Sequence, residues 1–199
     1  MTTDGTPDEA VPEDGRRARR HRSRDVVVDA LLELLSEGEH RPTAQQVAER
    51  SGVSLRSIFR IFADVQGLHA AATERHLTRV RHLFVDVEAV GTLDERAHTI
   101  VATTTRLYDS VAPIRRAAIR VAGDSPTVQA QVERARRWLR GEVDRVFADE
   151  LERSDDIDLA AAVEVLLSFE AWDQLRTGQG LDSERAMAVT HRAVVTLLG

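Results

Sequence analysis

Apolar residues recur every three or four positions along most of this chain, which is the spacing of one buried face of an α-helix. The first such stretch contains Val27, Leu31 and Leu34. Ser23 precedes it at a suitable position for an N-cap, and Gly38 follows it where a helix can end in a left-handed residue. The pattern therefore predicts a first helix from Ser23 to about Gly38.

The next apolar positions predict two short helices joined by a tight turn. Thr43 begins a capping box, and Ser51–Gly52 can end the helix that follows it. Ser54 can cap a second helix, in which Ile58 and Phe62 lie four positions apart on one inward face. Two short helices about such a turn form a helix-turn-helix, the motif that places its second helix in the major groove of DNA.

The outward face of that second helix carries Arg56, Ser57 and Arg60. A guanidinium can donate two hydrogen bonds at once to a guanine edge or to a phosphate, so this face has the chemistry of a DNA-reading surface. The alternative is an ordinary solvated helix face. We favour the reading surface, because the arginines lie on the helix that the motif presents to DNA.

Beyond the motif, the periodicity predicts more helices and no strand. The longest is expected from Asp64 to about Glu88, and Thr92 with Glu95 forms a capping box for a helix that ends near Tyr108. The remaining predicted helices are a short one with Pro113 in its first turn and its end near Gly123, and three longer ones over about 126–151, 157–176 and 183–198, the last two separated by Gly178–Gly180. The sequence thus predicts an all-α protein of nine helices.

The last two predicted helices are apolar around much of their circumference, and a helix of this kind is buried on more than one side. They could complete the core of a monomer or form a dimer interface. We favour the dimer, because two copies of a helix-turn-helix can read both halves of a palindromic site. The residues assigned to dimerisation are Leu166, Phe169, Trp172, Val189, Ala193 and Leu197.

Charge is segregated along the chain. The net charge is -6, yet residues 1–15 contain five acidic and no basic side chains, whereas residues 16–62 contain ten arginines and six acidic side chains. We expect residues 1–15 to be a disordered acidic leader and residues 16–22 to be a basic arm that contacts phosphates or a minor groove. A merely solvated basic tail is the alternative. The arm residues assigned to DNA contact are Arg19, Arg20 and Arg22.

The composition excludes several classes of protein. Without cysteine the chain has no disulfide and no thiolate metal site, and nothing in it indicates an oxidising compartment. No apolar run approaches the roughly 20 residues that span a bilayer, so we expect a cytoplasmic protein without membrane contact. The seven histidines are scattered, and neither a glycine-rich phosphate loop nor a G-x-S-x-G elbow is present. We therefore expect no enzymatic activity, no cofactor and no bound metal.

Residues 47–68, VAERSGVSLRSIFRIFADVQGL, resemble the signature of TetR-type transcriptional regulators, which reads IA..AGVS..T(L/F)(Y/F)..F.SKE.L. Identical or conservative matches fall in the turn and in the second helix, and the segment lies in the amino-terminal third behind a basic arm. The resemblance implies a nine-helix TetR-like architecture. Its parts would be a three-helix helix-turn-helix DNA-binding domain over residues 23–67 and a helical ligand-binding and dimerisation domain over residues 68–199.

The resemblance also implies which residues contact DNA. Arg56 stands at the position best suited to read a base, bidentate to guanine. Phe59 and Val65 replace the tyrosine and the lysine with which such proteins usually hold phosphate, so the hold on phosphate is expected to depend on Arg56, Arg60 and the arm. The positions carried over as DNA contacts are Thr43, Ser54, Leu55, Arg56, Ser57, Phe59 and Arg60.

A carboxy-terminal effector pocket is implied as well. Side chains on the three helices that usually surround such a pocket combine apolar area with a few polar groups, which favours an unknown small lipophilic or aromatic effector. Each of them could instead be an ordinary core residue. The residues assigned to the pocket are Phe84, Thr104, Tyr108 and Trp138.

These features together predict a ligand-responsive DNA-binding regulator of transcription. It would bind a palindromic double-stranded operator as a homodimer, and repression is the commonest activity among the regulators that it resembles. One alternative is a helical dimeric interaction protein that has lost DNA reading. A small-molecule-binding or catalytic helical domain without any link to DNA ranks last.

Overall fold

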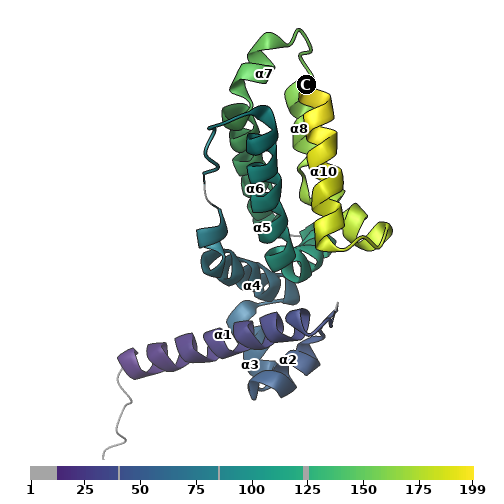
Figure 1. Cartoon of the computed structure of the whole chain (residues 1–199). Coiled ribbons are helices and arrows are strands. Elements are labelled where there is room, and N and C mark those ends of the chain that lie inside the picture. Colours follow the sequence, from purple (N-terminus) through teal and green to yellow (C-terminus); the bar gives the residue numbers. More distant parts are fainter. Residues whose placement is uncertain (1–12, 40, 85, 123–125) are drawn as a thin grey trace, which may run out of the picture.

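The computed structural model of the chain describes residues 13–39, 41–84, 86–122 and 126–199. Within these ranges it contains ten α-helices, a 3₁₀ turn, a π-helical turn and no strand (Figure 1). The prediction of an all-α fold is confirmed, and none of the helices described is long and apolar enough to cross a membrane. The elements are α1 (Glu13–Ser36), α2 (Ala44–Ser51), α3 (Leu55–Phe62), α4 (Val65–Arg79), η1 (Arg81–Leu83), α5 (Leu93–Ala122), α6 (Pro126–Val146), α7 (Ala148–Arg153), α8 (Leu159–Leu166), α9 (Phe169–Asp173), η2 (Gln174–Gly178) and α10 (Ser183–Leu198).

Helix α1 is continuous from Glu13 to Ser36, so the prediction that it begins at Ser23 is wrong. Residues 13–15 of the predicted leader form its first turn and the predicted arm follows on the same helix, while residues 1–12 lie outside the described part. Arginine and alanine, which make up most of residues 16–22, favour helix. The local preference of the arm therefore outweighs the capping signal at Ser23.

The two short helices of the motif form as the sequence predicts. The Gln46 amide donates to Thr43 Oγ1 at 3.2 Å, and the Thr43 amide donates to Gln46 Oε1 at 2.7 Å, which completes the capping box of α2. Gly52 ends α2 at φ 68°, a left-handed conformation that glycine adopts without strain. The Ser57 amide donates to Ser54 Oγ at 3.3 Å and so caps α3.

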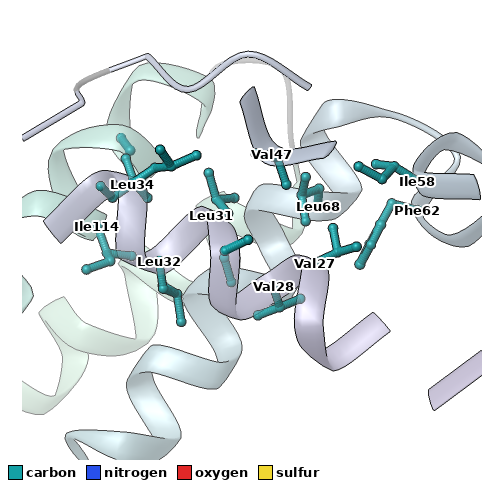
Figure 2. Packing of buried hydrophobic residues seen from close by; sticks show 14 of the residues in the cluster. Val27, Val28, Leu31, Leu32, Leu34, Val47, Ile58, Phe62, Leu68 and Ile114 are labelled. Atoms are coloured by element: carbon teal, nitrogen blue, oxygen red, sulfur yellow. The ribbon is translucent and has the colours of Figure 1, made fainter. Parts of the chain in front are cut away.

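A single apolar core holds α1, α2, α3 and the start of α4 together, and these four elements are called the head below. Figure 2 shows the side chains of this core meeting between the helices. Ile114 and Ala117 of α5 belong to the same core, so the head is packed directly on the helical body (Figure 1). The core residues that the head supplies include Val27, Leu31, Val47, Ile58, Phe62 and Leu68.

Ion pairs reinforce the contact between α1 and α4. Arg75 donates to both carboxylate oxygens of Asp29 at 3.0 Å and also bonds Asp25. Arg79 donates to Asp29 at 2.6 Å. Two aspartates of α1 therefore hold two arginines that lie one turn apart on α4.

Helix α4 is shorter than predicted, because it ends at Arg79 rather than near Glu88. A 3₁₀ turn follows, and residues 84 and 86–92, which precede α5, are not helical. The backbone amide of Val87 donates to a buried Glu142 carboxylate oxygen of α6 at 2.8 Å, and Val87 itself is buried. This tertiary hydrogen bond replaces the intrahelical one, which explains why apolar spacing alone extended the helix too far.

Helix α5 is one helix of 30 residues where two were predicted, with Pro113 in its interior. Proline removes one intrahelical hydrogen bond, but Val111, Ala112 and Ile114 around it are buried, so packing on both sides keeps the helix continuous. The helix predicted over 126–151 divides instead into α6 and α7, with Phe147 between them.

The apolar stretch predicted as one helix over 157–176 is divided into α8, α9 and η2. Ser168 separates α8 from α9, and its Oγ accepts a hydrogen bond from the Ala171 amide at 3.1 Å. Helix α10 follows as predicted and lies beside α8 along one side of the body (Figure 1).

A second core fills the body between α5, α6, α8 and α10, with Phe147 fully buried at its centre. At its edge lies a nearly buried ion pair between Arg96 of α5 and Glu150 of α7, with Nη2 to Oε1 at 2.7 Å and Nη1 to Oε2 at 3.0 Å. Arg96 also donates to the Val146 carbonyl, and Arg153 reaches Glu150 from the solvent side at 3.0 Å.

Candidate DNA-reading face and ligand cavity

The outward face of α3 is the strongest candidate for a contact with another molecule. Ile58 and Phe62 of this helix are buried in the head. On the opposite side, Leu55 is 36% exposed and Phe59 is 42% exposed, between the exposed Arg56 and Arg60. Large apolar side chains left in water beside two cations are characteristic of a surface that is covered on binding.

The two arginines of this face lack partners in the part of the chain that the structure describes. Among the described residues, neither Arg56 nor Arg60 has a hydrogen bond or an ion pair. By contrast, Arg50 at the end of α2 forms a two-pronged pair with Glu37 of α1, at 2.8 and 2.7 Å. The head therefore pairs Arg50 with carboxylates of α1, whereas Arg56 and Arg60 of α3 have no such partner among the described residues.

Thr43 and Ser54 are exposed, and both are used first as helix caps. The Thr43 hydroxyl donates to Gln46 Oε1 at 2.8 Å, and the Ser54 hydroxyl donates to Ser57 Oγ at 3.0 Å. These side chains set where α2 and α3 begin, which in turn fixes the direction of the arginines on α3.

The predicted arm is a helical extension of the head. The side chains of Arg19, Arg20 and Arg22 are exposed on the amino-terminal turns of α1. A helix rises about 1.5 Å per residue, so these cations have a fixed spacing along α1, unlike the cations of a flexible tail.

A partly open cavity of about 330 Å³ lies in the body between α4, α5, α6 and the segment from α8 to α9. Phe84, Tyr108 and Trp138 line it, as the sequence predicts. The Phe84 and Trp138 rings meet edge to face with their centroids 5.1 Å apart, and the Tyr108 hydroxyl donates to the Leu167 carbonyl at 2.8 Å. Burial raises the pKa of Tyr108 well above its usual range, so its phenol stays neutral.

Thr104 is the exception among the predicted pocket residues. It is buried on α5 outside the lining of the cavity, and its hydroxyl donates to the Ile100 carbonyl at 2.9 Å. A threonine that bonds to its own helix in this way leaves no donor for a ligand. The assignment of Thr104 to the pocket is therefore corrected.

Four lining residues have a buried polar atom without a partner among the described residues; of these, Trp138 was predicted and His76, Gln131 and Arg115 were not. His76 Nε2, Gln131 Oε1, Trp138 Nε1 and Arg115 Nε are buried and have no hydrogen-bond partner within the described part of the chain. Burial lowers the pKa of His76 despite an opposing hydrogen bond with the Ser110 backbone, so its ring is neutral at pH 7. The available signal was a polar residue interrupting an apolar helical stripe, as Arg115 does between Val111 and Ala118.

The residues predicted for dimerisation divide into two groups. Val189 and Leu197 of α10 are 37% and 40% exposed. Ala193 of α10 and Leu166 of the neighbouring α8 are half-buried. Phe169 and Trp172 are only 2% and 5% exposed and pack against Tyr108, with ring centroids 5.5 and 5.8 Å away. These two residues belong to the core of one chain, because the break at Ser168 turns α9 inward.

No group of three or more histidine, aspartate or glutamate side chains in the described ranges is arranged to hold a metal ion. The chemistry that the structure does offer is of two kinds: a cationic, partly apolar helix face on the head, and an apolar cavity with a few polar groups in the body.

Comparison with known proteins shows the fold. No protein-family model and no curated protein matches this sequence. Four solved chains match the structure, among them the crystal structure of a TetR-family transcriptional regulator from Streptomyces coelicolor. That match has a TM-score of 0.66 and 17% sequence identity, and it covers 89% of this chain and 80% of the other. The chain therefore has a TetR-like fold, as the sequence resemblance implies.

Proposed function

We propose that this chain with a TetR-like fold is a homodimeric, ligand-responsive repressor that binds a palindromic operator. The observation that carries the proposal is the outward face of α3, where Arg56 and Arg60 have no partner in the described chain and stand beside the exposed Phe59. Arginine reads guanine through two parallel hydrogen bonds, and an exposed aromatic ring can pack on a thymine methyl or a sugar.

The distribution of charge supports DNA as the partner. The chain is acidic overall, yet residues 16–62 carry a net charge of about +4, from ten arginines and six acidic residues. The arginines of the arm and of α3 are all on the head. On a protein that is acidic overall, a basic surface attracts the phosphates of DNA, and the acidic remainder of the surface repels them.

The pairing of α8 and α10 supports the dimer. Val165 of α8 is 64% exposed, and Val189 and Leu197 lie on the exposed side of α10, which contacts α8 within one chain. Two helices that share an apolar outer face can form a four-helix contact with a second copy about a two-fold axis. Such a contact would place two heads at the fixed spacing that a palindrome requires.

The cavity supports a response to a small ligand. Thr73, His76 and Leu77 of α4 line it, and Gln131 of α6 donates to the Ala70 carbonyl and to Glu74 on the same helix. Because α4 begins inside the core of the head, a ligand that shifts α4 shifts the head. An effector that prefers the shifted state weakens operator binding by the same coupling free energy, typically about 1–3 kcal/mol.

The first test concerns base reading. Replacing Arg56 by alanine should weaken binding to a duplex selected by this protein from a random library by about 1–3 kcal/mol, because no side chain then donates to the guanine edge. Binding to an unselected duplex of equal length should change far less. Fluorescence anisotropy at a fixed salt concentration measures both. If the wild-type protein shows no preference for any selected duplex, the proposed function is wrong and an interaction protein without DNA reading is the better description.

A second variant separates phosphate binding from base reading. Replacing Arg20 and Arg22 together by glutamine should weaken binding to all duplexes alike and reduce the slope of log K against log salt by about 1 for each phosphate that is no longer neutralised. Anisotropy titrations between about 50 and 200 mM salt measure the slope. Identical behaviour of this variant and of Arg56→Ala would contradict the division into an arm that binds phosphate and a helix that reads bases.

A further inference from the structure

Arg115 of α5 is the least compensated charge in the lining of the cavity. Its side chain is only 13% exposed, and its guanidinium carbon lies 4.6 Å from the centre of the Phe169 ring. Its one ion pair within the described chain is a contact of 3.5 Å with Glu170, which is too long and too loose for a two-pronged hydrogen bond. Its Nε–H is buried and finds no acceptor among the described residues.

The other charged residues of the lining have closer partners. Arg136 pairs with Glu133 at 3.1 Å and with Glu170 at 3.3 Å, so Glu170 is shared between two guanidinium groups. Glu164 accepts a hydrogen bond from Arg140 at 2.8 Å. The positive charge on Arg115 is therefore the one that the protein itself balances least.

The rest of the lining is apolar or neutral. Phe84, Leu107, Tyr108, Val111 and Leu139 provide apolar surface, and the His76 ring and the Trp138 indole are uncharged. The buried indole N–H of Trp138 is a second hydrogen-bond donor without an acceptor in the described chain. The lining also leaves Gln131 Oε1 and His76 Nε2 without a partner in the described chain, and neither of these two groups is a carboxylate that could balance Arg115.

We propose that the effector is an amphipathic monocarboxylic acid, bound as its carboxylate at Arg115 with its apolar chain or ring among Phe84, Trp138 and Leu107. This inference rests on the proposed role of the cavity as the effector site. A carboxylate supplies the two acceptors that a guanidinium takes in parallel, and pairing removes the cost of leaving that cation buried with a loose partner. A cationic ligand would be repelled by Arg115, for which the loose contact with Glu170 is the one ion pair in the described chain, and a neutral ligand would bury this arginine further without adding a countercharge.

The size of the cavity limits the ligand. A volume of about 330 Å³ is at the lower end of the range for ligand sites, so one aromatic ring or a medium-length alkyl chain fills it. Suitable probes are 4-phenylbutanoate and decanoate, each compared with its primary amide and with the amine of the same carbon skeleton. The members of each set match in shape and differ in the charge of one end.

Isothermal titration of the full-length protein at pH 7, without DNA, tests the proposal. At least one acid should bind at least tenfold more tightly than its amide, and the amine should bind more weakly than both. The proposal is overturned if the amide or the amine binds as tightly as the acid, or if neither acid binds at concentrations up to about 1 mM. These comparisons use the wild-type protein, so they do not depend on the folding of a variant.

A matched pair of variants locates the carboxylate. Arg115→Gln should lose at least tenfold in affinity for the acid and less than twofold for the amide. Arg116→Gln is the control, since Arg116 lies next in α5 but pairs with Asp173 at 2.7 Å and is not part of the lining. Equal losses in the two variants, with unchanged circular dichroism, would place the carboxylate elsewhere and refute the assignment.

The result of the ligand titrations can be distinguished from the result of the DNA-binding test of the proposed function. Operator selection tests whether the protein reads DNA, and the titrations test what the cavity binds. A protein that selects a duplex but prefers the amide would keep the proposed function and lose this inference. A protein that prefers the acid but selects no duplex would show the reverse.

Discussion

Replacing Val189 by arginine is expected to convert the protein to a monomer and to weaken its binding to a palindromic duplex by about 10²- to 10⁴-fold. Val189 is 37% exposed on the outer face of α10, and a two-fold axis would bring it close to its own copy or to α8 of the partner. Each interface would then contain two new buried charges, which cost several kcal/mol. A monomer retains one head and so loses the second half-site.

The measurement is light scattering after size exclusion, with the mass expected to fall from twice 22.1 kDa to 22.1 kDa. Binding to a single half-site should change little, because α3 is untouched. Val90→Arg is the control, since Val90 is an exposed valine in the segment before α5 and not on α8 or α10. A variant Val189→Arg that stays dimeric would show that the interface lies on another face.

The second large effect concerns stability. Replacing Glu150 by alanine is expected to lower the free energy of unfolding by about 3–5 kcal/mol, because it leaves Arg96 nearly buried without its carboxylate. Arg153→Ala removes the solvent-side partner of the same carboxylate and should cost less than about 1 kcal/mol, since Arg153 is largely exposed. Urea unfolding measured by circular dichroism gives both values.

A double variant, Arg96→Met with Glu150→Leu, sharpens the interpretation. Replacing both charges with apolar side chains of similar volume should be less destabilising than Glu150→Ala alone, because no unpaired charge remains. If the double variant unfolds as easily as the single one, the loss comes from packing around Phe147 and not from the stranded arginine.

The same ion pair predicts how stability depends on pH. The hydrogen bond from Arg96 lowers the pKa of Glu150 below its usual value of 4.5 despite partial desolvation. The pair therefore contributes its full stability above pH 4.5, and that contribution is lost as the pH falls through the lowered pKa of the folded state. Glu150→Gln should show a shallower loss of stability in this range of acid pH, which thermal melts can follow.

Local signals in the sequence predicted the two short helices α2 and α3 and their caps correctly. The capping box at Thr43, the left-handed glycine at 52 and the cap at Ser54 each act within a few residues, so their outcome does not depend on the rest of the fold. The inward positions of Ile58 and Phe62 follow from those starting points. Three of the four residues assigned to an effector pocket line the cavity, because large aromatic side chains in a helical body face its interior, and whether they bind a ligand stays a prediction.

The predicted helix boundaries were wrong where tertiary contacts determine where a helix ends or continues. The end of α4 depends on a hydrogen bond from Val87 to Glu142, which lies 55 residues away in sequence. The continuity of α5 through Pro113 depends on packing on both sides of the helix. In the sequence, Ser168 is a single polar residue within an apolar stretch. In the structure it ends α8 and caps α9, which places Phe169 in the core.

Arg115 shows why the chemistry of the cavity was harder to predict than its shape. Its position in α5 gives no hint that it lies over Phe169, because the two residues are far apart in the chain and meet only through the fold. An arginine in a helix is normally on the solvent side. Only the burial of its Nε and the distance to Glu170 reveal a cation that needs another partner.

The ion pairs of Asp25 and Asp29 with Arg75 and Arg79 fix α1 to α4, so α1 moves with α4 when α4 tilts. The amino-terminal end of α1 at Glu13 extends about 18 Å beyond Asp25, at about 1.5 Å for each helical residue. Any tilt of α4 therefore produces a displacement that grows along α1 towards Glu13, and among the residues proposed to contact DNA it moves Arg19, Arg20 and Arg22 the most. In the proposed repressor these outermost cations would leave the phosphates before the reading helix leaves the groove, so release would begin at the edge of the site and travel inward.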